Sequence, residues 1–277
     1  MTINCKGNIL DLSSPKVMGI LNITPDSFYD GGRYGNENKI NAQVEKMLDE
    51  GAAIIDIGAY SSRPGAAPLS EDEEYARIVP IVKLLVNNFP EIIISIDTFR
   101  AKVAHGCLLN GAALINDISA GNLDPKMYAT VASHRVPYIM MHMRGTPATM
   151  AKKTEYQNLL TDILYYFSEK TLRARQAGIN DIIIDPGFGF AKTLDQNYEI
   201  LQKMELLHQL DLPILTGLSR KSMIYKLLGT TPDMALNGST ALHMYSLSKG
   251  SNLLRVHDVK EAMECISLHH AIHTRKK

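Results

Sequence analysis

Several residue types are absent or scarce in the sequence. It has no tryptophan and only three cysteines among 277 residues. Cys5, Cys107 and Cys265 lie far apart and are odd in number, so neither a disulfide framework nor a cysteine-based zinc site is indicated. No apolar run approaches the roughly 18 residues of a membrane span, and the first residues lack the apolar core of a signal peptide. These absences predict a cytoplasmic protein.

The chain also lacks an excess of charge of either sign, because 29 Lys and Arg residues balance 29 Asp and Glu residues. This balance argues against a nucleic-acid or membrane partner, although a small anionic ligand needs only a local basic pocket. No linker or low-complexity segment divides the chain. A length of 277 residues suits one α/β barrel, which commonly has about 250. We predict a single domain over residues 1–277.

Eight apolar segments recur along the chain. Most are nearly continuous apolar runs, which is typical of strands in a buried parallel sheet. They begin about 34 residues apart, the length of a strand–helix–strand step. We predict an α/β fold, a (β/α)8 TIM barrel of parallel strands, with a short N-terminal extension in which the first 16 residues form a hairpin closing the bottom. The predicted strands are 17–23, 52–60, 92–98, 114–120, 137–143, 181–187, 213–219 and 252–258.

Local signals place some of the helices between these strands. Ser70 and Glu73 have the spacing of a capping box that opens a helix, and Pro80 inside the same pattern predicts a kink or a break. Asp124 followed by Pro125 predicts an N-cap with proline at the first helical position.

Polar residues end all eight predicted strands. The active site of an α/β barrel lies at the C-terminal ends of its strands, so these side chains should surround one mouth. A strand-end Asp is as often a helix cap as a catalytic group, but eight polar strand ends together are hard to explain as caps. The strand ends include Asn22, Asp56, Asp97, Asn116, Asp117, His142, Arg144, Asp185, Ser219, Lys221, Arg255 and His257.

The chemistry of these residues divides the mouth into two halves. Asp97, Asn116 and Asp185 suit a flat, nitrogen-rich heterocycle, because a carboxylate can accept two N–H bonds from one edge of such a ring. Asn22 offers an oxygen that could hold Mg²⁺ together with a diphosphate. The other half can bind phosphate through paired arginine contacts and point charges, with added N–H groups from the turns at Thr24-Pro25 and Pro64-Gly65. Its cations, or groups that can become cations, are Arg63, Lys221, Arg255 and His257.

Five motifs together resemble bacterial dihydropteroate synthases, a pterin-binding TIM-barrel family, over residues from about 15 to 265. The resemblance implies that the chain condenses 6-hydroxymethyl-7,8-dihydropterin diphosphate with p-aminobenzoate to form 7,8-dihydropteroate and diphosphate. It also implies Mg²⁺ as cofactor and a homodimer in the cytoplasm. The motifs are Asn22-Ile-Thr-Pro-Asp-Ser-Phe28, Ser61-Ser-Arg-Pro-Gly65, Asp185-Pro-Gly-Phe-Gly-Phe190, Ser219-Arg-Lys221 and Arg255-Val-His257.

The resemblance also implies a role for each matching position. The pterin would be held by Asp97, Asn116, Asp185 and Lys221. The diphosphate would be bound by Asn22, Ser62, Arg63, Arg255 and His257, with Asn22 also binding the metal. The p-aminobenzoate pocket would be lined by Phe28, Ser62, Pro64, Phe190, Ser219 and Lys221. The catalytic set would be Asp97, Asp185, Lys221, Arg255 and His257.

The chain departs from the family pattern at one loop. Ser62 stands where the family usually has threonine, and Ala59-Tyr60 stands where it often has Gly-Glu. Serine keeps the hydroxyl but loses the methyl group, so we expect changed inhibitor affinity and unchanged chemistry.

Three alternative functions fit parts of the pattern. A methyltetrahydrofolate-dependent methyltransferase would share the pterin-holding Asp and Asn residues but has no need of Arg63, Arg255 and His257. A non-catalytic pterin-binding paralogue should have lost some of the cationic positions. A sugar-phosphate barrel enzyme would have no use for Phe28 and Phe190 beside the cations.

Overall fold

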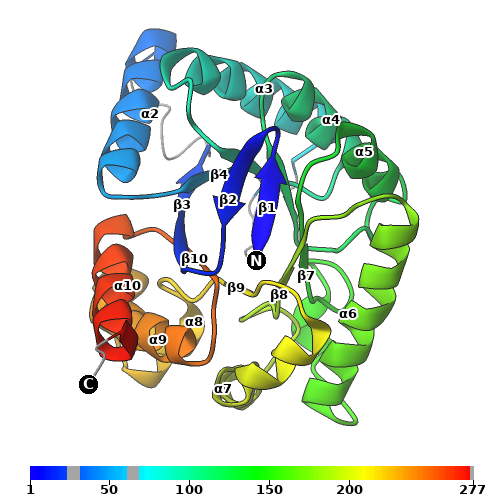
Figure 1. Cartoon of the computed structure of the whole chain (residues 1–277), viewed down its shortest axis with the longest axis vertical. Helices are drawn as coiled ribbons and strands as arrows, with labels where there is room; N and C mark the ends of the chain where they lie inside the picture. Colours follow the sequence, from blue (N-terminus) through cyan, green and yellow to red (C-terminus); the bar gives the residue numbers. More distant parts are fainter. Residues whose placement is uncertain (24–31, 61–68, 275–277) are drawn as a thin grey trace.

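Eight parallel strands form one sheet in the order β8-β7-β6-β5-β4-β3-β10-β9 (Figure 1). An isolated parallel bridge between Ile184 and Ile214, with a 3.0 Å hydrogen bond from Ile184 N to Pro213 O, joins the two edges. The predicted barrel is therefore confirmed. The strands are β3 (Lys16–Asn22), β4 (Ile54–Gly58), β5 (Ile94–Asp97), β6 (Leu114–Asp117), β7 (Tyr138–Met141), β8 (Ile182–Asp185), β9 (Leu215–Thr216) and β10 (Leu253–Val256).

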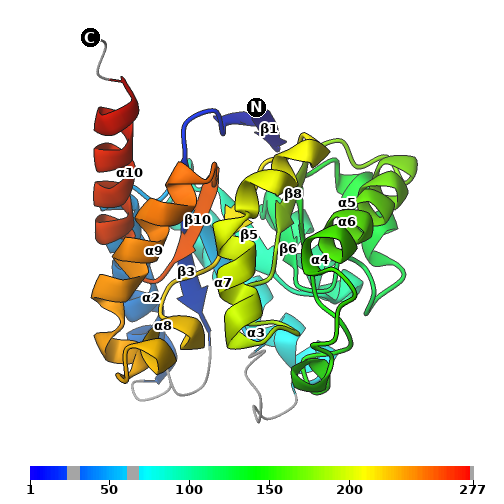
Figure 2. The same cartoon turned by 90° about the horizontal axis from the view of Figure 1, so that it is seen from below.

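Helices surround the barrel on its outside (Figures 1 and 2). The computed structural model describes residues 1–23, 32–60 and 69–274. Within them, the α-helices are α2 (Gly32–Asp49), α3 (Glu71–Asn88), α4 (Ala101–Leu109), α5 (Met127–His134), α6 (Leu159–Gln176), α7 (Leu194–Gln202), α8 (Ser222–Leu227), α9 (Leu236–Ser248) and α10 (Val259–Thr274). Short 3-10 turns are η2 (Met150–Lys152), η3 (Met204–Leu210) and η4 (Pro232–Met234).

An antiparallel hairpin of β1 (Thr2–Cys5) and β2 (Asn8–Asp11) covers the N-terminal end of the barrel (Figure 1). Ile3, Cys5 and Leu12 are buried against residues from the first halves of the strands, such as Ile54. The backbone N–H of Asn4 also donates to the Asp181 carboxylate at 2.9 Å. The predicted closing hairpin is therefore confirmed, and it leaves the opposite end of the barrel as the mouth.

Side-chain alternation along the strands decides which residues enter the barrel. In β4, Ile55 and Ile57 pack in the main core between strands and helices, while Ile54 packs in the cluster beneath the hairpin. Because successive side chains point to opposite faces, Asp56 shares the inward face with Ile54. An acidic residue inside an apolar strand is thereby directed toward the barrel axis.

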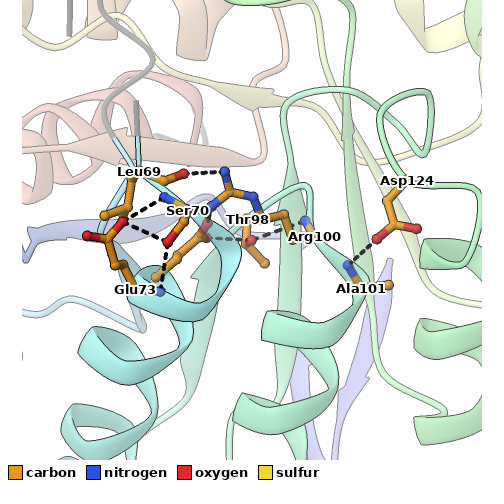
Figure 3. Close-up of polar contacts among 8 residues, drawn as sticks. Leu69, Ser70, Glu73, Thr98, Arg100, Ala101 and Asp124 are labelled. Carbon is orange, nitrogen blue, oxygen red and sulfur yellow. Dashed lines mark hydrogen bonds and ion pairs between the residues drawn. The ribbon is translucent and has the colours of Figure 1, made fainter. Parts of the chain in front are cut away.

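The helix signals in the sequence are only partly confirmed (Figure 3). Ser70 and Glu73 form the predicted capping box of α3. Of the kink or break predicted at Pro80, the break is wrong, because α3 continues through Pro80 from Glu71 to Asn88. The predicted helix start at Pro125 is wrong, because α5 begins at Met127. Asp124 Oδ1 still accepts the N–H of Lys126 at 2.9 Å just before α5, while its Oδ2 accepts the N–H of Ala101 at 2.8 Å, at the start of α4. The carboxylate serves the neighbouring helix because its side chain reaches an N–H that has no partner within α4.

All three cysteines are buried and free. Cys107 packs in the main core from α4. Among the residues described, no helix has the length and apolarity to span a bilayer.

Candidate active site

Arg255 links carboxylates from two other strands at the barrel mouth. Its Nε lies 2.6 Å from Asp56 Oδ2, and its Nη2 lies 2.7 Å from Asp97 Oδ2. Asn116 Nδ2 donates to the same Asp56 oxygen at 3.0 Å. Strands β4, β5, β6 and β10 therefore contribute to one polar cluster, as the positions of their ends predicted.

Asp56 is fully buried, and its second oxygen, Oδ1, has no hydrogen-bond partner among the described residues. A buried carboxylate oxygen without a donor carries an uncompensated desolvation cost. A ligand that presents an N–H group at this position would remove that cost.

The electrostatics of Asp97 reflect the same crowding. Burial, with a further contribution from the Asp56 carboxylate, raises the pKa of Asp97 to about 7, against the opposing effect of Arg255. A carboxyl group with this pKa can hold or release a proton near neutral pH.

On the other side of the mouth, Asp185 and Lys221 interact electrostatically. Asp185 ends β8, and its Oδ1 accepts the N–H of Gly187 at 2.7 Å. Lys221 Nζ donates to the carbonyl oxygen of Phe188 and lies 4.9 Å from the centre of the Phe190 ring. Burial lowers the pKa of Lys221 to about 8, although the Asp185 carboxylate opposes this shift. Burial raises the pKa of Asp185, and the Lys221 charge counteracts it.

Ser219 and His257 form a third contact at the ends of β9 and β10. Ser219 Oγ lies 3.1 Å from His257 Nδ1 and accepts the His257 backbone N–H at 3.2 Å. The pairing holds the imidazole beside the loop that leads to Lys221.

Two polar strand ends serve the fold and do not join this cluster. The Asp117 carboxylate accepts hydrogen bonds from Tyr138 Oη at 2.6 Å and from the N–H of Ser119 at 2.7 Å. Arg144 pairs with Asp162 at 2.8 Å and lies 3.9 Å from the Tyr156 ring centre, outside the barrel. The polar strand ends thus divide into a site and its structural supports.

Comparison with known proteins identifies the family. A model of the pterin-binding enzymes matches residues 18–257. The dihydropteroate synthase of Escherichia coli (strain K12) is 41% identical over 268 residues, which cover 96% of this chain and 94% of that protein. The chain belongs to the dihydropteroate synthase family.

Solved structures from the same family superpose closely. The Yersinia pestis dihydropteroate synthase, solved as a sulfonamide drug complex, is 42% identical with a TM-score of 0.92, covering 98% of this chain and 99% of that one. The Xanthomonas albilineans dihydropteroate synthase in complex with 7,8-dihydropteroate is 34% identical with a TM-score of 0.88, and both chains are covered completely (100%). The shared fold extends over the whole chain.

Several predicted site residues lie outside the described residues. They are Phe28, Ser62, Arg63 and Pro64, together with the turns at Thr24-Pro25 and Pro64-Gly65. Asn22 is described, at the end of β3 beside Gly58 of β4, and its side chain is exposed. Nowhere in residues 1–23, 32–60 and 69–274 do three or more His, Cys, Asp or Glu side chains form a possible metal cluster.

The sequence placed Asp56 at the mouth but gave it no binding role, and it did not single out Lys192. Asp56 carried a usable signal, since an acidic residue within the run from Ile54 to Ile57 needs a buried partner. Lys192 carried none, because a lysine just before a helix normally points to solvent. In the structure it is buried against His142 and the turn that follows β8.

Proposed function

We propose that this chain catalyses the dihydropteroate synthase reaction. It would join 6-hydroxymethyl-7,8-dihydropterin diphosphate to p-aminobenzoate and release diphosphate and 7,8-dihydropteroate. The observation that carries the proposal is the convergence of Asp56, Asp97 and Asn116 around Arg255 at the mouth of a barrel whose relatives are dihydropteroate synthases.

The pterin half of the site would use Asp97, Asn116, Asp185 and Lys221. Asp56 joins this set because its buried carboxylate lies in the same cluster. Carboxylates accept the N–H groups of an amino-amidine edge, and the unpartnered Asp56 Oδ1 supports such a ligand. The same negative charges would stabilise positive charge that develops on the dihydropterin when its bond to diphosphate breaks. This supports a dissociative displacement.

The diphosphate half would use Asn22, Ser62, Arg63, Arg255 and His257. Arginine can grip two phosphate oxygens, and His257 lies beside Ser219. The exposed Asn22 side chain offers one amide oxygen, which fits Mg²⁺ because this ion keeps several waters and takes few protein ligands alongside phosphate oxygens. When bound, Mg²⁺ would neutralise charge on the diphosphate.

The p-aminobenzoate pocket would be formed by Phe28, Ser62, Pro64, Phe190, Ser219 and Lys221. The contact of Lys221 with the Phe190 ring supports a pocket that is apolar on one side and cationic on the other, as a benzoate requires. A C–O bond to diphosphate breaks, a C–N bond to the neutral arylamine forms, and the arylamine nitrogen then loses one proton. No strong general base is needed because the attacking nitrogen is uncharged at neutral pH.

A coupled assay tests this function directly. Diphosphate release by the purified chain should require both the pterin diphosphate and p-aminobenzoate, and 7,8-dihydropteroate should appear in equal amount by mass spectrometry. Chelation with EDTA should abolish turnover, and added Mg²⁺ should restore it. Diphosphate release that does not depend on p-aminobenzoate would exclude the proposed reaction.

We further propose a cytoplasmic homodimer. Its support is three exposed apolar side chains at α8 and η4, with Leu227 61%, Leu228 58% and Met234 72% exposed. A groove of about 470 Å³ between α7 and α9, lined by Tyr198 and Tyr245 among others, lies in the same part of the barrel. Light scattering should give twice the chain mass, and Met234→Glu should shift the protein toward monomer; a monomeric wild type would exclude the dimer.

A further inference from the structure

A second lysine is buried beside the candidate site and has no role in the proposed reaction. Lys192 follows the turn after β8, and only 9% of its surface is exposed. Its Nζ lies 2.9 Å from the carbonyl oxygens of both Gly187 and Phe190 and 3.0 Å from His142 Nδ1. Moving a lysine side chain out of water costs free energy, so its N–H donors must form hydrogen bonds inside the protein.

The partners of Lys192 match the donors of an ammonium group. An ammonium has three N–H donors, and the three nearest acceptors are the two carbonyl oxygens and the imidazole Nδ1, with the His142 carbonyl oxygen a more distant fourth at 3.4 Å. Burial lowers the pKa of Lys192, and the Asp185 carboxylate opposes that shift. Burial and the adjacent Lys192 charge lower the pKa of His142, which keeps the imidazole neutral and its Nδ1 able to accept.

The two carbonyls lie at the two ends of one irregular turn, residues 187–190. Gly187 and Gly189 adopt φ angles of +70° and +81°, which few other residues tolerate. A 3.1 Å hydrogen bond from Phe190 N to Gly187 O closes the turn. Lys192 therefore holds a segment that regular secondary structure does not hold.

The same turn also carries three contacts of the candidate site. Gly187 donates its N–H to Asp185, and the Phe188 carbonyl accepts from Lys221. The Phe190 ring lies under the same Lys221 ammonium at 4.9 Å. A shift of the turn would move Asp185 and Lys221 together.

We propose that Lys192 is a positioning residue, which braces turn 187–190 from behind so that Asp185 and Lys221 meet the pterin in a fixed geometry. It does not contact the substrate. The proposal rests on the proposed function, because that function assigns the pterin to these two side chains. Misplacing a binding group by a fraction of its contact distance commonly costs about ten- to a hundred-fold in efficiency.

The test compares Lys192→Met with a matched buried lysine. Lys170→Met removes a lysine on α6 that is 6% exposed and bonds Asn122, with no contact to the turn. Both variants are checked for a cooperative melt, and the affinity for the pterin diphosphate is measured by calorimetry without p-aminobenzoate. We expect folded Lys192→Met to bind about tenfold or more weakly, Lys192→Arg to recover part of the loss, and Lys170→Met to bind like the wild type.

Three outcomes would overturn the proposal. Pterin affinity of Lys192→Met within twofold of wild type means that the turn holds without the lysine. An equal loss in Lys170→Met, or loss of the folded state in both Lys192 variants, assigns Lys192 to general stability. If the wild type binds the pterin diphosphate but forms no dihydropteroate, the proposed function fails while this binding test remains valid.

Discussion

Arg255 Nε lies 2.6 Å from the fully buried carboxylate of Asp56, across the mouth of the barrel. The same guanidinium holds Asp97, so one cation stands between two carboxylates from neighbouring strands. Without it, two acidic groups would face each other in a site of low polarity, which favours protonation of one of them. The ionisation state of Asp97 therefore affects the free energy of unfolding.

Stability should depend on pH through Asp97. Burial and Asp56 raise its pKa from 3.8 to about 7. Between these two pH values, the folded chain keeps a proton on Asp97 that the unfolded chain has already released. The contribution of Asp97 to the free energy of unfolding thus falls as pH rises from about 4 to 7, by about 1.4 kcal/mol per pH unit inside that window. Asp97→Asn cannot ionise and should lack this fall in urea unfolding from about pH 5 to about pH 8.

An exposed acid gives the control for that measurement. Asp49→Asn, at the end of α2, should give a stability profile parallel to that of the wild type. If Asp97→Asn is also parallel to the wild type, the carboxyl of Asp97 does not titrate in this window.

The rate should fall at alkaline pH through Lys221. Its pKa of about 8 means that the ammonium, which we assign to substrate binding, is lost progressively above that pH. The value of kcat/KM should then decline about tenfold per pH unit above about pH 8. Lys221→Arg keeps its charge over this range, so the decline should disappear even if the rate is lower overall. A decline that survives in Lys221→Arg belongs to another group.

The barrel was predictable from sequence because each strand is a continuous apolar run and each strand end is polar. What the sequence could not reveal is which polar end turns inward. Asp97 and Asp117 end adjacent strands, yet Asp97 joins Arg255 while Asp117 is engaged by Tyr138. Asn116 points inward to Asp56, so Asp117, the next residue of β6, lies on the opposite face, where Tyr138 reaches it. A continuous apolar run does not reveal which phase of this alternation faces the barrel axis.

Local signals failed where a tertiary contact competed with them. Asp124 precedes a proline and looks like the cap of a helix that begins at Pro125, but its carboxylate is shared between the N–H of Lys126 and the N–H of Ala101 from α4, and α5 begins only at Met127. Pro80 does not end α3, because the helix buries Ile78, Val79 and Val82 on either side of it. Burial of this apolar face outweighs the loss of one backbone hydrogen bond.

Gly187 should not tolerate a side chain. Its φ is +70°, and a Cβ there would lie 2.2 Å from the carbonyl oxygen of His142, which is backbone and cannot swing away. Gly187→Ala should lower the free energy of unfolding by about 2–4 kcal/mol and reduce kcat/KM, because its N–H orients Asp185. Gly229→Ala shares a positive φ of +64° but meets open space, so it should cost only about 1 kcal/mol. Equal losses in urea unfolding would mean that backbone strain alone explains both.

Arg100 stabilises a buried acid and contacts both residues that flank segment 61–68, of which Figure 3 shows Leu69. It pairs with Glu74, which is fully buried and also accepts from Thr98 Oγ1 at 2.6 Å. It donates to the carbonyl of Leu69, and its guanidinium lies 5.5 Å from the Tyr60 ring centre. One side chain therefore connects α3 with the residues on either side of that segment.

Removing the Arg100 guanidinium should be severe, because Glu74 would remain buried without its cation. Arg100→Met is expected to lower the free energy of unfolding by about 3–5 kcal/mol in urea titrations. Burial raises the pKa of Glu74 and Arg100 counteracts it, so the loss should be larger at pH 8 than at pH 5, where Glu74 can take up a proton. The double variant Arg100→Met/Glu74→Gln removes the unpaired charge and should recover part of the loss at pH 8. Lys102→Met, which breaks an exposed pair with Asp72, should leave stability unchanged. If Arg100→Met also leaves the free energy of unfolding unchanged, the pair with Glu74 does not stabilise the fold.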